Sequence, residues 1–496
     1  MAPAVKGGLA AAGVALAVGA VTLNRTLVGV FYDDGLYTGL ALALAGGQGY
    51  VHPHLPGAPA AVHYPPVYPL VLAPLVGLFP LHAAALAGKV LNLLLGALGA
   101  GLVAWHAVRV NLLGLDPTRA VSRWLAPAVV AATAMAIPVL AVQSVLFSEP
   151  LFAVLLATAI IAADRGAAPW LTGLAVALAL LTRSIAIAAC AGIAASWLVR
   201  REPWPRIRAA LLPAVAAAVL WGAWVLTHAD GIDPAIGLNY GSYGEHLRQA
   251  GLAPLAHAPD IARPLAALTL GWIPWRWVYD VCTIAAIGIG LYGITILARR
   301  SAIGYTLACY LLVLALWPEV PDRFLWAVLP WLALAWPAGA VALWRRPGGA
   351  VRIPVAALAA FMVVGYAVYE ARGLAGRWWA GQSEAIAANF AELLPAVAAL
   401  PADAVLATDN EALVWLYTRR RTVPLYLFAW RGGELVEPDP AAHRAFLERQ
   451  GVTHVLLAAA RGGSARELRA LMHTYPGWLA GMSSWAGGRG LFVVTP

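Results

Sequence analysis

The stretch that decides the fold is Gly8–Tyr37, GLAAAGVALAVGAVTLNRTLVGVFYDDGLY. Its first part, Gly8–Val30, is apolar and long enough to cross a bilayer as one helix, which needs about 20 residues. Two adjacent carboxylates, Asp33 and Asp34, follow directly after this expected span. Ionisable groups beside lipid are costly and mark chemistry or ion handling where they occur. We therefore expect a functional site in water next to the end of the first span.

The composition places the whole chain in a membrane. Of its 496 residues, 61% are hydrophobic and 11% are charged, whereas soluble domains carry about 25% charged residues. The formal net charge of +9 comes mostly from arginines in short connections between apolar runs, so it indicates membrane topology and not a nucleic-acid partner. The three cysteines lie within apolar runs and predict neither a disulfide nor a metal site.

Eleven apolar runs predict a polytopic α-helical protein that crosses the membrane about eleven times. Pro66–Pro80 is left out of the spans because it is short and proline-rich, so we expect it to form an interfacial or re-entrant helix. With that choice every cluster of arginines falls on one side, which the positive-inside rule makes cytoplasmic. The apolar runs are residues 8–30, 86–108, 124–142, 150–163, 170–182, 184–199, 209–227, 277–298, 302–317, 323–343 and 353–369.

Because successive spans alternate in direction, the same count of spans assigns the remaining polar segments to the external face of the membrane. They are Asp33–Asp34, Ser148–Glu149, Arg183, the loop from about 228 to 276, Glu319–Arg323 and everything after about residue 370. The first span, which follows Lys6, could be a signal peptide, but its apolar run is longer than a typical signal core, so we expect an uncleaved anchor whose N-terminus is cytoplasmic.

The last segment changes character and predicts a second domain. Amphipathic stretches (383–397, 441–450 and 465–473) alternate with short β-prone runs (404–408, 453–457 and 491–495). This alternation favours a small α/β domain. We expect a transmembrane module over residues 1–370 and an external α/β domain over 371–496, which covers the site and helps to select the acceptor.

The first external loop contains most of the polar candidates. Leu36–Ala45 is amphipathic and too short to span, so it predicts a helix lying along the surface. One alternative is an ordinary wet loop in which Asp33 or Asp34 caps this helix by accepting N–H bonds. Since adjacent side chains point in different directions, we expect one of the two carboxylates to reach a substrate. Three histidines, His52, His54 and His63, lack an established metal-ligand spacing, so neither a metal nor another cofactor is predicted.

The order of motifs resembles the GT-C glycosyltransferases, and most of all the branch of protein O-mannosyltransferases and bacterial lipid A aminoarabinose transferases. Each motif is short, and their order along most of the chain carries the resemblance. The motifs are Tyr32–Tyr37, Gly46–Tyr50, Tyr64-Pro65-Pro66 with Pro69, Ser148–Phe152, Leu181–Arg183, Asp322–Leu325 and Ala407–Asn410 followed by Arg419–Arg421.

The resemblance implies transfer of a sugar from a polyprenyl-phosphate donor to a lipid, glycan or protein acceptor. It implies a bacterial inner-membrane enzyme whose active site faces the external side. In that family the first-loop acid is the catalytic base, and Asp33 matches it best, with Asp34 as a second acid that orients or pairs. A carboxylate can take the proton of the attacking hydroxyl, and a single displacement with one base would invert the anomeric carbon, whereas retaining enzymes pair two carboxylates.

Fixed cations are expected to hold the leaving phosphate. Arg183 and Arg323 are the first candidates, because arginine binds phosphate through two N–H groups, and Lys89 is the third. Each of them has the alternative of snorkelling to the headgroups or pairing with a local acid such as Asp322. Glu149 is expected to orient the sugar, to pair with an arginine, or to serve as a first-turn acid of its helix.

Further residues are expected to orient the substrate: His63, Tyr64, Tyr240 and Tyr243. Aminoarabinose transferases carry a lysine where this chain has His63-Tyr64, which leaves the donor sugar open. The tryptophans Trp272, Trp275 and Trp277 are expected to be interfacial anchors, with an aromatic platform for the face of a sugar as the alternative.

Two other classes of function stay open at this point. A transporter or flippase for lipid-linked sugars would use the same external charges, but it should show paired repeats and ionisable residues near the midplane. A scaffold subunit without catalysis is the other. The acids lie at one face and no repeat is evident in the sequence, so the transferase is favoured.

Overall fold

The computed structural model describes residues 2–116, 118–166, 168–250, 258–317, 322–347, 349–431 and 434–495. Glu319 and part of the predicted loop between 228 and 276 lie outside the described residues. The chain divides into two compact units. Unit 1 comprises Met1–Asn24, Lys89–Trp221 and Leu252–Gly381, and unit 2 comprises Arg25–Gly88, Gly222–Gly251 and Gln382–Pro496. Unit 2 therefore combines the first loop with the C-terminal segment.

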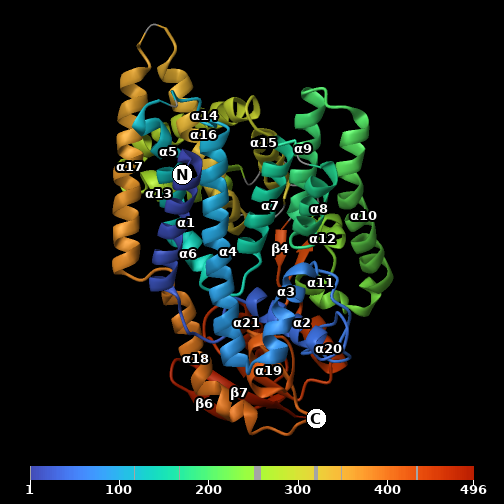
Figure 1. Ribbon diagram of the computed structural model, residues 1–496. Helices are drawn as coiled ribbons and strands as arrows, with labels where there is room; N and C mark the ends of the chain where they lie inside the picture. Colours follow the sequence, from blue (N-terminus) through green and yellow to red (C-terminus); the bar gives the residue numbers. More distant parts are fainter. Residues whose placement is uncertain are drawn as a thin grey trace. The chain divides into compact units, whose positions relative to one another are not determined.

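Unit 1 consists of helices. They are α1 (Pro3–Thr22), α4 (Leu81–Arg109), α5 (Ala120–Met135), α6 (Ile137–Gln143), α7 (Glu149–Asp164), α8 (Pro169–Leu180), α9 (Ile187–Val199), α10 (Trp204–His228), α13 (Ala258–Leu270), α14 (Arg276–Ala298), α15 (Ala302–Leu316), α16 (Asp322–Trp344) and α17 (Arg352–Ala375), with a 3-10 turn η1 at Ser184–Ala186. Two of these helices, α4 and α10, extend at one end into the residues of unit 2 (81–88 and 222–228). Figure 1 shows the long helices α1, α4 and α17 running in similar directions.

The helical membrane class predicted from the sequence is confirmed. Among the described residues, six helices are long and apolar enough to cross a membrane: α1, α4, α10, α14, α16 and α17. The pair α5 and α6, bent by 61° at a break, would make a seventh. Each of the eleven predicted runs contains helix, but α8, α9 and α15 are short, so the number eleven stays a prediction.

The prediction of one helix over Gly8–Val30 was wrong at its end, because α1 stops at Thr22. The next residues include Asn24, whose side chain accepts a hydrogen bond from the Lys89 ammonium at 2.8 Å. The indole N–H of Trp379 donates to the carbonyl of Thr22 at 3.1 Å, which satisfies one of the carbonyls left open at the helix end. Polar residues within the apolar run therefore end the helix.

The bend between α5 and α6 is fastened by α17. The carboxylate of Glu370 accepts a hydrogen bond from the Ile137 amide, 3.2 Å from Oε2, and the Tyr366 hydroxyl donates to the Ala132 carbonyl at 2.5 Å. A break in a helix frees amides and carbonyls that need partners. These two side chains supply them, so the break is a built feature of the unit.

Close backbone contact joins α14 and α16. A Cβ placed on Gly293 would lie 1.7 Å from the carbonyl oxygen of Ala335, and one on Gly339 would lie 2.2 Å from that of Ile289. Only glycine allows helices to approach so closely, which is the usual way membrane helices pack.

Unit 2 combines helices with a mixed sheet. Its helices are α2 (Asp33–Ala45), α3 (Val67–Leu78), α11 (Gly237–Tyr240), α12 (Tyr243–Ala250), α18 (Gly381–Ala398), α19 (Glu411–Thr418), α20 (Pro440–Arg449) and α21 (Gly463–Thr474). Its strands are β1 (Val405–Thr408), β2 (Arg421–Pro424), β3 (Ala429–Arg431), β4 (Glu434–Val436), β5 (His454–Leu457), β6 (Leu479–Trp485) and β7 (Arg489–Val494).

The sheet has the order β2-β1-β5-β7-β6, while β3 and β4 form a separate antiparallel pair. β1 is parallel to both of its neighbours, and β7 is antiparallel to β5 and β6. The three predicted strands are β1, β5 and β7, so the expected α/β segment is confirmed. α3 is the short helix expected at Pro66–Pro80, and α2 packs against both α3 and α19 (Figure 1).

Candidate active site

The chain makes a strained turn directly before Asp33. Tyr32 has φ 66° and ψ −74°, and the Asp33 amide donates to the Phe31 carbonyl at 2.8 Å. These dihedral angles and this bond define a γ-turn of the rare kind, with positive φ. A side chain other than glycine in such a conformation costs about 1–3 kcal/mol and persists where the surroundings enforce it. The position of Asp33 therefore depends on the groups that hold this turn.

The two adjacent carboxylates have different surroundings. Asp34 is fully buried, and its oxygens accept from the Gly29 amide at 2.7 Å and from the Phe31 amide at 2.9 Å. Asp33 is partly exposed and accepts from the Tyr64 hydroxyl at 2.7 Å. The helix cap expected for one of these acids is replaced by bonds to the preceding loop. Asp34 holds the turn, and Asp33 is the carboxylate of the pair that reaches the surface.

Aromatic residues of the first loop surround Asp33. The Tyr64 ring packs edge to face on Tyr37, with centroids 5.2 Å apart, and burial raises the pKa of Tyr64, to which the charge of Asp33 adds. The Tyr64 hydroxyl therefore stays protonated as a donor to Asp33. His63 Nδ1 lies 2.8 Å from the Gly241 carbonyl, and the His63 ring lies 4.3 Å from that of Tyr243. Asp33, Tyr64, His63 and Tyr243 thus form one neighbourhood.

Tyr240 has a different environment from Tyr243. It is fully buried, and its hydroxyl donates to Glu411 Oε1 at 2.5 Å. Since that hydroxyl has one proton to give, His54 Nε2, 2.9 Å away, donates to its oxygen. Sequence reasoning missed Glu411, although a lone carboxylate opening the apolar stretch Ala412–Leu416 was the available signal. Tyr240, expected among the substrate-orienting residues, lies in the core of unit 2.

A second polar cluster, in unit 1, contains the expected cations. Glu149 opens α7, Arg183 stands between α8 and η1, and Arg323 is near the start of α16. Glu149 Oε1 lies 2.9 Å from Arg183 Nη1 and 2.5 Å from Arg323 Nε. The guanidinium of Arg183 faces the Phe324 ring at 4.7 Å. Two guanidinium groups against one carboxylate leave the cluster one net positive charge.

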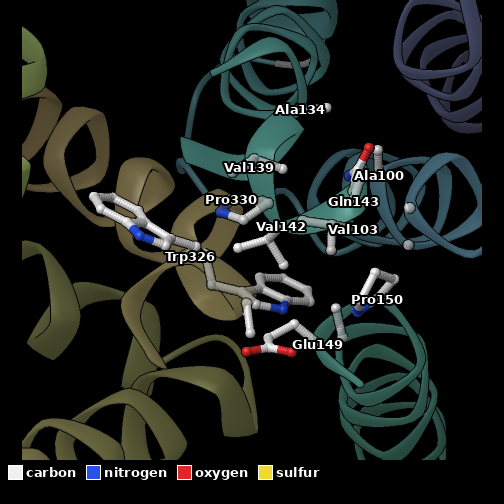
Figure 2. Close-up of a pocket in the computed structure, with 15 residues that line it drawn as sticks. Ala100, Val103, Ala134, Val139, Val142, Gln143, Glu149, Pro150, Trp326 and Pro330 are labelled. Carbon is white, nitrogen blue, oxygen red and sulfur yellow. The ribbon is translucent and has the colours of Figure 1, made fainter. Parts of the chain in front are cut away.

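The cluster adjoins an apolar pocket of about 50 Å³. Figure 2 shows Trp326 and Val142 in its lining, with Glu149 among the lining residues. Gly96, which has no side chain, and Ala100, which has only a methyl group, line the pocket from α4. Lys89, the third expected cation, is 1% exposed and bonded to Asn24. Among the described residues, no group of three or more His, Cys, Asp or Glu side chains is arranged to hold a metal ion.

No protein-family model and no curated protein sequence matches the chain. ArnT from Cupriavidus metallidurans bound to undecaprenyl phosphate superposes with a TM-score of 0.50 and 14% identity, over 97% of this chain and 96% of that one. The oligosaccharyltransferase of Archaeoglobus fulgidus in complex with Zn and sulfate has a TM-score of 0.52 and 13% identity, over 98% and 73%. Both are GT-C superfamily members, so the chain has the GT-C fold that the sequence motifs resembled.

Proposed function

We propose that this protein is a membrane glycosyltransferase that moves a sugar from a polyprenyl-phosphate donor to an acceptor at the external face of a bacterial inner membrane. The observation that carries the proposal is Asp33, a partly exposed carboxylate held by the Tyr64 hydroxyl at a strained turn on a GT-C fold. One of the fold neighbours, ArnT, has undecaprenyl phosphate bound.

Asp33 is the proposed base. It accepts the proton of the acceptor hydroxyl while that oxygen forms a bond to the anomeric carbon and the bond from this carbon to the phosphate oxygen breaks. The electron pair of the broken bond stays on the phosphate, which needs no proton to leave. One displacement inverts the anomeric centre. Asp34 contributes by holding the turn, because both of its oxygens accept backbone amides.

Arg183 and Arg323 are the proposed binding groups for the donor phosphate. Both already face the carboxylate of Glu149, which occupies the anion position that a phosphate oxygen would take. Fixed cations stabilise the charge that develops on the leaving group. We assign Glu149 the orientation of these two arginines. Lys89 is the third proposed cation, and a phosphate there would have to compete with Asn24 for its ammonium.

His63 and Tyr243 are the proposed contacts to the sugar. Both are partly exposed and lie beside Tyr64 or beside each other. Tyr64 orients Asp33 through its hydrogen bond. Tyr240 is fully buried, so its proposed part in orienting the substrate is indirect. Aromatic faces suit the C–H surface of a sugar, and hydroxyl and imidazole groups suit its O–H groups.

Release of polyprenyl phosphate from a panel of polyprenyl-phosphate sugars by the purified protein tests the proposal. Asp33→Asn should lower the rate by about 10²–10⁴-fold, the usual effect of losing a general base, with an unchanged melting temperature. Asp403→Asn, an exposed acid of the same unit, is the matched control. If sugar transfer survives in Asp33→Asn, the assignment of Asp33 as the base is wrong. Movement of the donor from one leaflet to the other in proteoliposomes, without release of polyprenyl phosphate, would favour the transporter.

A further inference from the structure

The C-terminal segment forms part of the support for the Tyr32 turn. A Cβ on Gly29 would lie 2.6 Å from the Cβ of Leu413, and one on Gly35 would lie 3.0 Å from that of Ala412. The Tyr417 hydroxyl accepts from the Val28 amide at 3.0 Å. Helix α19 therefore touches the chain on both sides of the turn, within unit 2, and leaves no room for side chains at the two glycines.

A line of buried polar groups reaches the same turn from the first residue of α19. Glu411 is fully buried, as is its partner Tyr240. The Tyr240 ring lies edge to face against Tyr32, with centroids 6.3 Å apart. The backbone of Glu411 is also tied down, because its carbonyl accepts from the Thr422 hydroxyl at 2.8 Å. Glu411 is therefore positioned to fix the Tyr240 ring, which packs against the strained residue Tyr32.

We propose that Glu411 is a positioning residue for the transfer reaction, acting through Tyr240 on the Tyr32 turn that presents Asp33. This inference rests on the proposed function for its kinetic part and on geometry alone for its structural part. It gives the C-terminal segment a role in shaping the site of the base, beyond the covering role expected from the sequence.

The groups that face Glu411 determine how its charge matters. They are Tyr32 from the first loop, Tyr240 from α11 and Asp409 from the segment before α19. His54 acts indirectly, because it hydrogen-bonds to the Tyr240 hydroxyl. Burial raises the pKa of Glu411 to about 7, and burial raises that of Tyr32, with Glu411 adding to the effect. A carboxyl group accepts from Tyr240 in either state, but the ionised form accepts more strongly. The hold on the turn should therefore strengthen as the pH rises through neutrality.

Three variants test the proposal by donor kinetics. Glu411→Ala should lower kcat by about tenfold or more, since a misplacement of about 1 Å can cost 10²-fold, while the donor KM stays unchanged because the phosphate ligands lie on other residues. Glu411→Gln keeps a neutral acceptor for Tyr240, so its kcat should exceed that of Glu411→Ala and should lack the increase through pH 7 that ionisation of Glu411 gives the wild type. Glu467→Gln is the matched control, a buried acid of the same segment that accepts from the Leu427 amide at 3.1 Å.

Hydrogen exchange of the peptide Gly29–Leu36 provides a readout without substrate. Exchange should accelerate in Glu411→Ala and in Tyr240→Phe, which removes only the hydroxyl, and should stay at the wild-type rate in Glu467→Gln. If the wild-type protein transfers no sugar, the proposed function fails, but these exchange rates still test whether Glu411 holds the Tyr32 turn. Wild-type exchange in Glu411→Ala and Tyr240→Phe, or wild-type kcat in an active Glu411→Ala protein, would overturn the inference.

Discussion

Replacing each of the two adjacent acids by its amide should separate chemistry from structure. Asp34→Asn keeps one carbonyl oxygen, so one of the two bonds to the Gly29 and Phe31 amides (2.7 and 2.9 Å) can persist. The other amide then faces the N–H₂ group of the new side chain, donor against donor. Since Asp34 is fully buried, water cannot replace the lost acceptor.

The expected loss follows from these two bonds. A hydrogen bond to a charged group contributes about 1.5–3 kcal/mol, and a buried donor left without a partner costs about 1–3 kcal/mol. Together they predict that Asp34→Asn destabilises unit 2 by about 3 kcal/mol, taking the lower part of these ranges. For a unit of this size, about 2–4 °C of melting temperature per kcal/mol converts this into a decrease of about 6–12 °C.

Asp33→Asn should behave differently, because its carbonyl oxygen can still accept from Tyr64 and part of the side chain is exposed. Its free energy of unfolding should stay within about 0.5 kcal/mol of the wild-type value, as is usual for surface changes. Its melting temperature should therefore be close to that of the wild type. Thermal unfolding in detergent, followed by tryptophan fluorescence, measures both variants beside Asp403→Asn. Equal melting temperatures for Asp34→Asn and the wild type, or an equal loss in Asp33→Asn, would refute this assignment of the two acids.

Two further predictions concern the other charged groups. Arg183→Lys or Arg323→Lys keeps the charge but loses the forked contact, so the donor KM should rise by about tenfold, the equivalent of 1.4 kcal/mol; Arg276→Lys, whose side chain is 96% exposed, should leave it unchanged. Burial raises the pKa of Glu467 from 4.5 to about 8, so its neutral form favours the fold below pH 4.5 and this contribution is lost as the pH rises through 8. Glu467→Gln should therefore gain melting temperature relative to the wild type between these pH values, and a difference that does not grow with pH would contradict the direction of that shift.

Local sequence patterns predicted the helices and the central strands, because both depend on short-range periodicity. β1, β5 and β7 are short apolar runs and were found. β2 begins with Arg421 and ends with Pro424, and β6 exposes most of its side chains, so neither shows the alternation of a half-buried strand. The end of α1 was missed because Asn24 and Arg25 were read as part of an apolar run.

The site was predictable where motifs carry it and hidden where distant residues meet. Asp33 and Tyr64 were both named from the first-loop motifs, and they are hydrogen-bonded. Tyr240 and Glu411 are 171 residues apart in the chain, and no spacing rule links such a pair. Glu149 was open to several interpretations, and only the fold shows that both arginines contact it.

Each half of the proposed chemistry is prepared within a single unit. In unit 1, the buried guanidinium of Arg183 would be strongly unfavourable without a partner. Glu149 supplies that partner and also pairs with Arg323, and in the proposed reaction the donor phosphate competes with it for both arginines. In unit 2, the turn at Tyr32 stores strain that the Asp34 bonds and the packing of α19 offset, and this fixes where Asp33 stands. A preorganised base needs little rearrangement in the transition state. Substitutions in the arginine cluster should therefore raise the donor KM and also lower kcat, because these residues bind the donor and stabilise the leaving phosphate. Substitutions around the turn should lower kcat at an unchanged donor KM, because they only place the base.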